Sequence, residues 1–154
     1  MAIEIERKFL LKYFPNVDHE TRVSITQGYL NLDKNKTVRV RVSGSSAFLT
    51  VKGLTQGASR KEFEYPIPLD DARDMLMMCK ETSITKDRIF LAYQGKDIWE
   101  IDIFHGKNSG LIVAEIEVSS EDYEINLPDW IGEEVTNDPR YYNSNLIIHP
   151  FNTW

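Results

Sequence analysis

The chain has 154 residues, and its 18 Lys and Arg against 24 Asp and Glu give a formal net charge of −6. This length predicts a single domain covering residues 1–154, and the acidic total argues against a protein that binds nucleic acid through its overall charge. A lone cysteine, Cys79, excludes a disulfide framework. The sequence has no 18-residue apolar run, and its N-terminus is charged from the fourth residue, so we expect a cytoplasmic protein.

Alternation of apolar and polar residues predicts eight β-strands along the chain. In order, they cover residues 3–11, 23–32, 37–43, 47–53, 61–67, 82–93, 97–105 and 111–118. Helix signals mark three further segments: 70–81 starts with acidic residues, 119–125 starts with serines suited to capping, and 139–148 has Pro139 in its first turn. The chain is therefore expected to be mainly β, with a few helices.

Charged residues occur in pairs two positions apart on several predicted strands, with mostly apolar residues between them. Side chains two apart on a strand share one face. For a single pair, a solvated sheet face is the usual interpretation. The repetition favours one shared charged face that carries four carboxylate pairs and two cation pairs, with Lys8 and Lys52 in addition: Glu4 and Glu6, Glu62 and Glu64, Glu100 and Asp102, Glu115 and Glu117, Arg39 and Arg41, Lys86 and Arg88.

Such a face has a chemical use. Neighbouring carboxylates repel one another, and hard divalent cations such as Mg²⁺, Mn²⁺ and Ca²⁺ relieve this repulsion by binding their oxygens. Arginine grips phosphate with two parallel hydrogen bonds, and lysine adds a point charge. One face with both features meets the requirement of metal-assisted phosphoryl transfer. Whether Glu62 and Glu100 belong to the same cavity is left open.

Eight strands with one charged face predict an α+β, mainly β fold. We expect a closed eight-stranded antiparallel barrel, or tunnel, with a polar charged lumen, because closure leaves no free strand edges. The apolar exterior then needs cover from the helices or from a partner subunit.

The motifs resemble, in order, those of the CYTH superfamily, also called triphosphate tunnel metalloenzymes. Glu4-Ile5-Glu6-Arg7-Lys8 resembles the ExExK signature of that family, and Gly132 to Leu146 is similar to the C-terminal pattern of its short bacterial members. The other matching stretches are Arg39-Val40-Arg41, Leu49-Thr50-Val51-Lys52, Arg60-Lys61-Glu62-Phe63-Glu64, Lys86-Asp87-Arg88, Glu100-Ile101-Asp102 and Glu115-Ile116-Glu117. The resemblance runs from residue 2 or 3 to about residue 150.

The charged face and the resemblance together assign roles to its residues. The predicted phosphate ligands are Lys8, Arg39, Arg41, Lys52, Lys86 and Arg88, of which Lys8, Lys86 and Arg41 are predicted to be catalytic. The predicted ligands of one or two Mg²⁺ or Mn²⁺ ions are Glu4, Glu6, Glu64, Asp102, Glu115 and Glu117. Arg140 has two open interpretations, a side chain at the tunnel mouth or a surface charge on the last helix.

The resemblance implies metal-dependent hydrolysis of a triphosphate. Inorganic triphosphate is favoured, because little of the chain lies outside the motifs to build a nucleobase or thiamine pocket. Alternatives on the same tunnel are an adenylyl cyclase or a nucleoside or thiamine triphosphatase, and a further one is a polyphosphate-binding module without turnover. The expected partner is a small-molecule triphosphate, with no nucleic acid and no membrane. The oligomeric state is open, with a homodimer as one alternative.

Overall fold

The computed structural model describes residues 2–18 and 20–154, most of them in strands. The strands are β1 (Ile3–Leu11), β2 (Thr21–Asn31), β3 (Lys36–Ser43), β4 (Ser46–Gly53), β5 (Ser59–Pro66), β6 (Ser83–Tyr93), β7 (Asp97–Phe104), β8 (Ile112–Glu117) and β9 (Ile131–Glu134). The helices are α1 (Leu69–Met77) and α2 (Asn143–Ile148), with the short 3₁₀ turns η1 (Lys80–Thr82), η2 (Gly106–Asn108), η3 (Pro139–Tyr141) and η4 (Phe151–Thr153).

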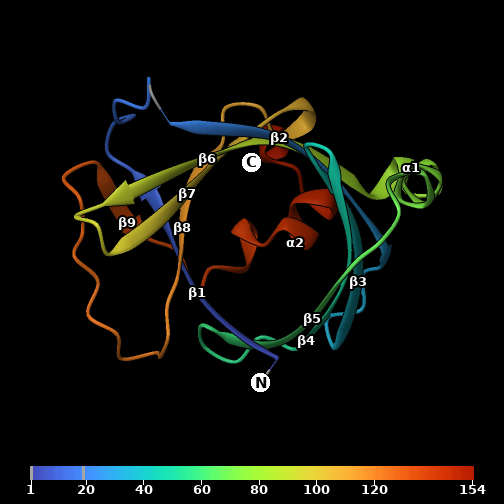
Figure 1. The fold of residues 1–154 in the computed structure, drawn as a ribbon, viewed down its shortest axis with the longest axis horizontal. Coiled ribbons are helices and arrows are strands. Elements are labelled where there is room, and N and C mark those ends of the chain that lie inside the picture. Colours follow the sequence, from blue (N-terminus) through green and yellow to red (C-terminus); the bar gives the residue numbers. More distant parts are fainter. Residues whose placement is uncertain (1, 19) are drawn as a thin grey trace.

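Eight antiparallel strands close into a ring (Figure 1). Around it, the order is β1, β5, β4, β3, β2, β6, β7 and β8, which returns to β1. Strand β1 closes the ring because its start pairs with β5, Ile3 opposite Lys61, while its middle pairs with β8, Lys8 opposite Glu115. The predicted closed eight-stranded barrel is therefore confirmed. Strand β9, which the sequence did not predict, adds to the far end of β1.

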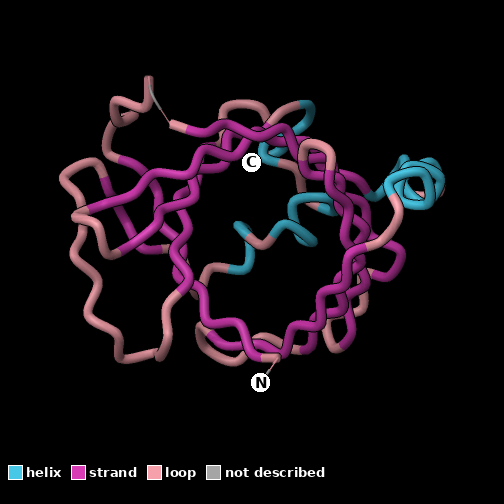
Figure 2. Tube along the Cα trace, in the orientation of Figure 1, coloured by secondary structure: helices cyan, strands magenta, loops and turns pink. Residues whose placement is uncertain are grey.

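Two hydrophobic cores lie on the outside of the barrel, on the strand faces opposite the charged residues. One contains Trp99, Ile101 and Ile116 and is covered by the segment that follows β8. The other lies between β3, β4 and α1, which stands outside the ring of strands (Figure 2). Helix α1 and the turn after it approach β2 closely, since a Cβ atom on Gly28 would come within 2.5 Å of the Cβ of Cys79. Covering segments, as expected, shield the apolar exterior.

The helix predicted at 119–125 is wrong. The segment forms a turn in which the Ser120 hydroxyl donates to Asp122 at 2.7 Å, and then runs on without helical structure. Tyr123 and Ile125, two residues apart, both pack against the core around Trp99. A spacing of two is the spacing of extended chain, so packing on the sheet overrides the capping signal of the serines.

The helix predicted at 139–148 is interrupted. Its first turn is η3, Tyr142 is extended with φ −68° and ψ 131°, and α2 begins only at Asn143. We call residues 139–148 the plug, because α2 lies within the ring of strands when the barrel is viewed along its axis (Figure 1). The helix predicted at 70–81 is likewise shorter, since α1 ends at Met77 and η1 follows.

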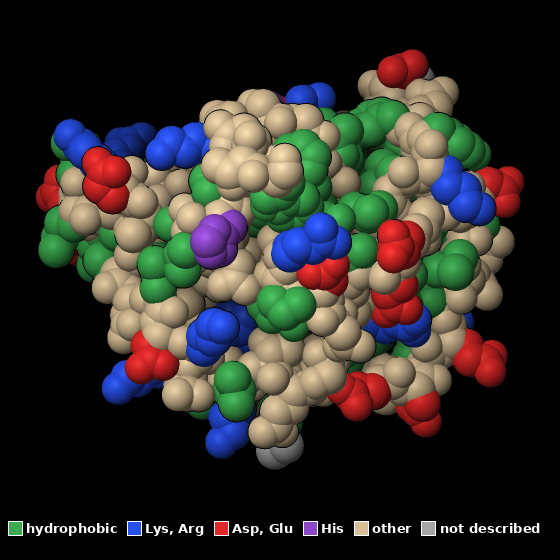
Figure 3. All heavy atoms as spheres, turned by 180° about the vertical axis from the view of Figure 1, so that it is seen from behind, with side chains coloured by type: hydrophobic (Ala, Val, Ile, Leu, Met, Phe, Trp, Pro, Cys, Tyr) green, Lys and Arg blue, Asp and Glu red, His purple; other side chains and the backbone are tan. Residues whose placement is uncertain are grey.

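A third core lies inside the barrel and explains where the plug docks. Ile84, Phe104 and Val113 lie on the same strand faces as the lumen charges, two residues from Lys86, Asp102 and Glu115 respectively. These three side chains cluster with Tyr141 and the fully buried Leu146 of the plug. The lumen thus turns from charged to apolar at one end, and the plug covers that end. Seen from behind, the centre of the molecule is filled with side chains, and acidic and basic groups are interspersed over this face (Figure 3).

None of the helices in the described ranges is long and apolar enough to cross a membrane.

We predict that Val40→Asp will lower the free energy of unfolding by several kcal/mol. Val40 has no solvent exposure beneath α1, and an ionised carboxylate there would lose its hydration without gaining a partner. Chemical denaturation measures the effect, with Lys36→Asp at the exposed start of β3 as the control, expected to shift stability by less than about 1 kcal/mol. Equal stability of the two variants would contradict the assignment of the outer face of β3.

Candidate active site

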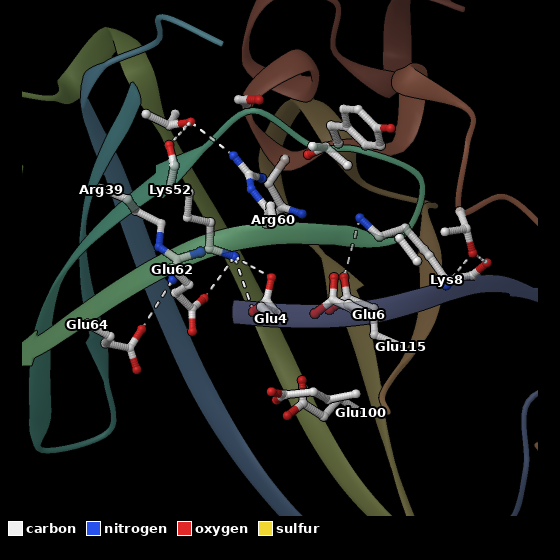
Figure 4. A pocket seen from close by; sticks show the side chains of 18 of the residues that line it. Glu4, Glu6, Lys8, Arg39, Lys52, Arg60, Glu62, Glu64, Glu100 and Glu115 are labelled. Atoms are coloured by element: carbon white, nitrogen blue, oxygen red, sulfur yellow. Dashed lines mark hydrogen bonds and ion pairs between the residues drawn. The ribbon is translucent and has the colours of Figure 1, made fainter. Parts of the chain in front are cut away.

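A cavity of about 230 Å³ lies inside the barrel and is lined mainly by charged side chains (Figure 4). The labelled lysines and arginines lie across the upper part of the view, and the labelled glutamates, from β1, β5, β7 and β8, lie below them. In the described residues, the lining contains seven cations and seven carboxylates: Lys8, Arg39, Arg41, Lys52, Arg60, Lys86, Arg88, Glu4, Glu6, Glu62, Glu64, Glu100, Glu115 and Glu117. With all groups ionised, this lining is electrically neutral.

The structure brings the predicted site residues together with one exception. All six predicted phosphate ligands line the cavity, as do five of the six predicted metal ligands. Glu62 and Glu100, whose membership the sequence left open, also belong to the lining. The exception is Asp102, which lies behind the wall of the cavity rather than on it.

Asp102 acts as the buried counter-ion of two cations. It has no solvent exposure, and its carboxylate accepts hydrogen bonds from Lys86 Nζ at 2.8 Å and from Arg88 Nε and Nη2 at 2.7 and 2.9 Å. Burial alone would raise the pKa of Asp102, but Arg88 and Lys86 lower it below the ordinary range. Both oxygens are therefore occupied by the side chains that point to the cavity.

Carboxylates crowd where β1 meets β8, because the antiparallel register places Glu6 opposite Glu117 and Lys8 opposite Glu115. Burial, then the neighbouring charges of Glu115 and Glu4, raise the pKa of Glu6 well above its usual value. Burial and Glu4 also raise the pKa of Glu117. Glu115 behaves oppositely: burial opposes its ionisation, yet Lys8 and Arg88 lower its pKa. At this corner of the cavity, burial and the neighbouring carboxylates therefore both oppose the ionisation of Glu6 and Glu117.

The other carboxylates of the lining form ion pairs with single cations. Lys52 Nζ lies 3.0 Å from Glu4 and 3.2 Å from Glu62. Arg39 lies 3.5 Å from Glu64, whose side chain keeps 36% of its exposure. These partly exposed pairs contrast with the fully enclosed bonds of Asp102.

Three cations of the lining have lowered pKa values, and burial is the main cause for each of them, Arg60 included. Burial, and then the nearby charges of Arg39 and Arg88, lower the pKa of Arg41 to about 10. Burial lowers the pKa of Lys86 to about 8, although Asp102 acts in the opposite direction. Because these groups have lost hydration that their partners do not fully replace, an anion in the cavity would stabilise their charge.

The plug contributes to the site through contacts that the sequence did not predict. Lys8 Nζ donates to the carbonyl oxygen of Tyr141 at 3.0 Å, and Lys86 Nζ donates to Oδ1 of Asn143 at 3.0 Å. The ring of Tyr142 lies 5.9 Å from Lys8 Nζ. No local motif signals these contacts. They depend on the interruption of the helix at Tyr142 and join residues more than 50 positions apart in the sequence.

Sequence reasoning also missed Arg60, Tyr29 and Thr37 as members of the lining. A signal for Arg60 was present, because it lies two residues from Glu62 and thus on the same strand face. Thr37 likewise lies two residues from Arg39, whereas no predicted site residue lies two positions from Tyr29. Of the two interpretations of Arg140, the structure favours the surface charge: it is exposed, bonded to Asp138 at 2.8 Å, and outside the cavity lining.

The donor set of the cavity suits a hard divalent cation. Its carboxylate oxygens are the ligands that Mg²⁺ and Mn²⁺ prefer. Burial first, and then repulsion from Glu115 and Glu4, raise the pKa of Glu6, and such an ion would relieve this repulsion. Among residues 2–18 and 20–154, no three His, Cys, Asp or Glu side chains are already arranged as a metal site. Several of these carboxylates are instead paired with cations of the lining.

A closed antiparallel barrel whose interior holds paired arginines, lysines and carboxylates is a charged tunnel, lined by the kinds of side chain that bind polyanions and divalent cations. The model of the CYTH domain matches residues 2–145, and the chain belongs to this family. Members of the family that hydrolyse triphosphates generally depend on metal ions.

Comparisons with individual proteins agree with this membership. The chain is 45% identical over 152 residues to an inorganic triphosphatase of Acetivibrio thermocellus, covering 98% of this chain and 97% of that protein. It is 36% identical over 152 residues to an inorganic triphosphatase of Nitrosomonas europaea, covering 94% and 97%. The crystal structure of the inorganic triphosphatase NE1496 superposes with a TM-score of 0.71 at 32% identity and covers 96% of each chain.

We predict that Asp102→Asn will lower the free energy of unfolding by about 3–5 kcal/mol, because it leaves Lys86 and Arg88 without their shared buried counter-ion. Urea unfolding measures the loss. Asp87→Asn, which breaks the exposed pair with Arg22, is the matched control and should cost less than about 1 kcal/mol. Equal losses in the two variants would show that the buried cations do not depend on Asp102.

Proposed function

We propose that this protein is a divalent-metal-dependent phosphohydrolase whose preferred substrate is inorganic triphosphate. The observation that carries the proposal is the cavity, where seven cations and seven carboxylates share one enclosed interior. The names of the relatives from Acetivibrio thermocellus and Nitrosomonas europaea, which match nearly the whole chain, support the same activity.

In the proposed reaction, the cations of the lining bind the phosphate oxygens. Arg39 and Arg41 offer forked hydrogen-bond donors, and Arg88 offers the guanidinium hydrogens that its bonds to Asp102 leave over. Lys8, Lys52 and Lys86 add point charges. These groups stabilise the negative charge that grows on the oxygens in the transition state of phosphoryl transfer. Lys8, Arg41 and Lys86 are proposed to be the catalytic cations.

Substrate binding is proposed to exchange partners inside the cavity. Arg39 and Lys8 each lie 3.5 Å from a carboxylate, beyond ordinary charged hydrogen-bond distance, so phosphate oxygens compete readily for them. The carboxylates released in this way, together with the crowded group at the β1–β8 corner, are the proposed metal ligands: Glu4, Glu6, Glu64, Glu115 and Glu117. A divalent ion held there supplies charge neutralisation and polarises the attacking water.

Asp102 takes a different role in this proposal. Because its two oxygens are bonded to Lys86 and Arg88, we assign it to positioning these cations rather than to binding metal.

The chemistry of the lining favours a bare polyphosphate over a nucleotide. Tyr29 and Tyr142 are the aromatic residues among the described lining, and Tyr142 already lies over Lys8. A nucleobase needs apolar or aromatic surface on which to stack, whereas this cavity presents mostly charges. The plug also covers the apolar end of the lumen, so that this surface is not open to a base.

The proposal is tested with the purified protein and a panel of inorganic triphosphate, ATP and thiamine triphosphate, each with Mg²⁺, Mn²⁺ or Ca²⁺. We expect the highest kcat/KM for inorganic triphosphate, loss of activity after exhaustive chelation, and recovery when Mg²⁺ or Mn²⁺ is returned. Comparable turnover of ATP would contradict the substrate assignment, and full activity after chelation would contradict the metal requirement. Cyclic AMP from ATP would indicate a cyclase, and tight binding without phosphate release a binding module.

We predict that Arg41→Lys will lower kcat/KM for triphosphate by roughly 10- to 150-fold, since lysine keeps the charge but loses the forked contact, and a charged hydrogen bond contributes about 1.5–3 kcal/mol. Steady-state kinetics measures the loss. Arg22→Lys, on the exposed outer surface, is the matched control and should behave like the parent protein. Normal kinetics for Arg41→Lys would remove Arg41 from the phosphate site.

A further inference from the structure

The plug reaches the cavity cations with uncharged acceptors. Oδ1 of Asn143 accepts a hydrogen bond from Lys86 Nζ at 3.0 Å and a second one from Gln27 Nε2, also at 3.0 Å. Gln27 has no solvent exposure, and its Oε1 accepts from Nε of Arg41 at 3.2 Å. A pair of side-chain amides, one from β2 and one from the plug, therefore lies between Arg41 and Lys86.

An amide oxygen holds a cation differently from a carboxylate. Both accept the hydrogen bond and fix the direction of the donor, but only the carboxylate cancels its charge. On its other side, Lys86 already meets the carboxylate of Asp102 at 2.8 Å. A second carboxylate at position 143, which lines the cavity, would both over-neutralise this lysine and repel an incoming anion.

We propose that Asn143 is a positioning residue for triphosphate turnover: it orients Lys86 directly, and Arg41 through Gln27, while leaving their positive charge available to the substrate phosphates. This inference rests on the function proposed above. The interruption of the helix at Tyr142 matters for this role, because it makes Asn143 the first residue of α2 and places its amide in the cavity lining.

The geometry allows a test that separates charge from structure. Within the described part of the chain, the side chain of Asn143 makes its hydrogen bonds through Oδ1 alone. The variant Asn143→Asp has nearly the same shape and keeps both acceptor contacts, so a purely structural role would be preserved. We expect it to fold with an unchanged or higher melting temperature and to lose kcat/KM for inorganic triphosphate on the order of 10- to 100-fold.

Three further variants complete the experiment. Asn143→Ala removes the acceptor and should also lose kcat/KM, whereas Asn143→Gln keeps a neutral amide oxygen and should recover part of the loss. Asn152→Asp adds the same charge at an exposed position of η4, outside the cavity, and should match the parent protein in both readouts.

The outcomes distinguish this inference from the proposed function. A parent protein inactive on every triphosphate overturns the proposed function itself. If the parent protein is active and Asn143→Asp has a kcat/KM within twofold of the parent value, only the positioning role is overturned. A melting temperature of Asn143→Asp that falls in parallel with its activity would show that the residue is only structural, and would overturn the inference as well.

Discussion

Charge neutralisation inside a closed barrel is the constraint on which the rest of this structure depends. Closure turns one face of every strand inward, and several of these faces carry lysine, arginine or glutamate. An unpaired charge in such an interior costs several kcal/mol, so each cation needs a partner in the folded state. Asp102 meets this need for Lys86 and Arg88 with bonds of 2.7–2.9 Å and no solvent exposure. The side chains of Lys86 and Arg88 are therefore held in position before a ligand binds.

The partners of the cations fall into three kinds that suit different tasks. Asp102, bonded through both oxygens and fully enclosed, is too costly to displace. Glu64 and Glu115, each 3.5 Å from its cation, are held loosely enough to give way to phosphate oxygens. The Asn143 amide and the Tyr141 carbonyl direct a lysine without neutralising it. A fixed counter-ion, exchangeable carboxylates and neutral acceptors together keep the cavity stable when empty and leave individual cations available to phosphate oxygens.

Much of the fold follows from period-two alternation, because each strand must separate an apolar outer face from a charged inner one. That rule located the eight barrel strands and placed Arg39 and Arg41 opposite the buried Val40. The same rule places Arg60 on the strand face of Glu62, two residues away. Local signals failed where distant packing decides the conformation: the serines at 119–120 suggest a helix cap, yet Tyr123 and Ile125 must lie along the core around Trp99.

The contacts of the plug lay beyond sequence reasoning for the same physical reason. The break at Tyr142 has no clear local cause, and the acceptor at Asn143 has meaning only beside Gln27 and Lys86, which lie on β2 and β6. A continuous helix over residues 139–148, as the sequence predicted, would direct the side chains of Tyr142 and Asn143 elsewhere.

The plug joins the folding of the barrel to the chemistry of its cavity. Its apolar residues Tyr141 and Leu146 bury the inner core around Phe104, which would otherwise expose hydrophobic surface in a charged lumen. The same packing fixes the backbone that presents the Tyr141 carbonyl to Lys8 and the Asn143 amide to Lys86. Hydrophobic burial does not depend on the screening of charges or on the arrival of an anion, whereas the ion pairs of the lining do. Anchoring the two lysines to a hydrophobically docked segment therefore keeps their direction constant while the exchangeable carboxylates of the lining, such as Glu64 and Glu115, change partners.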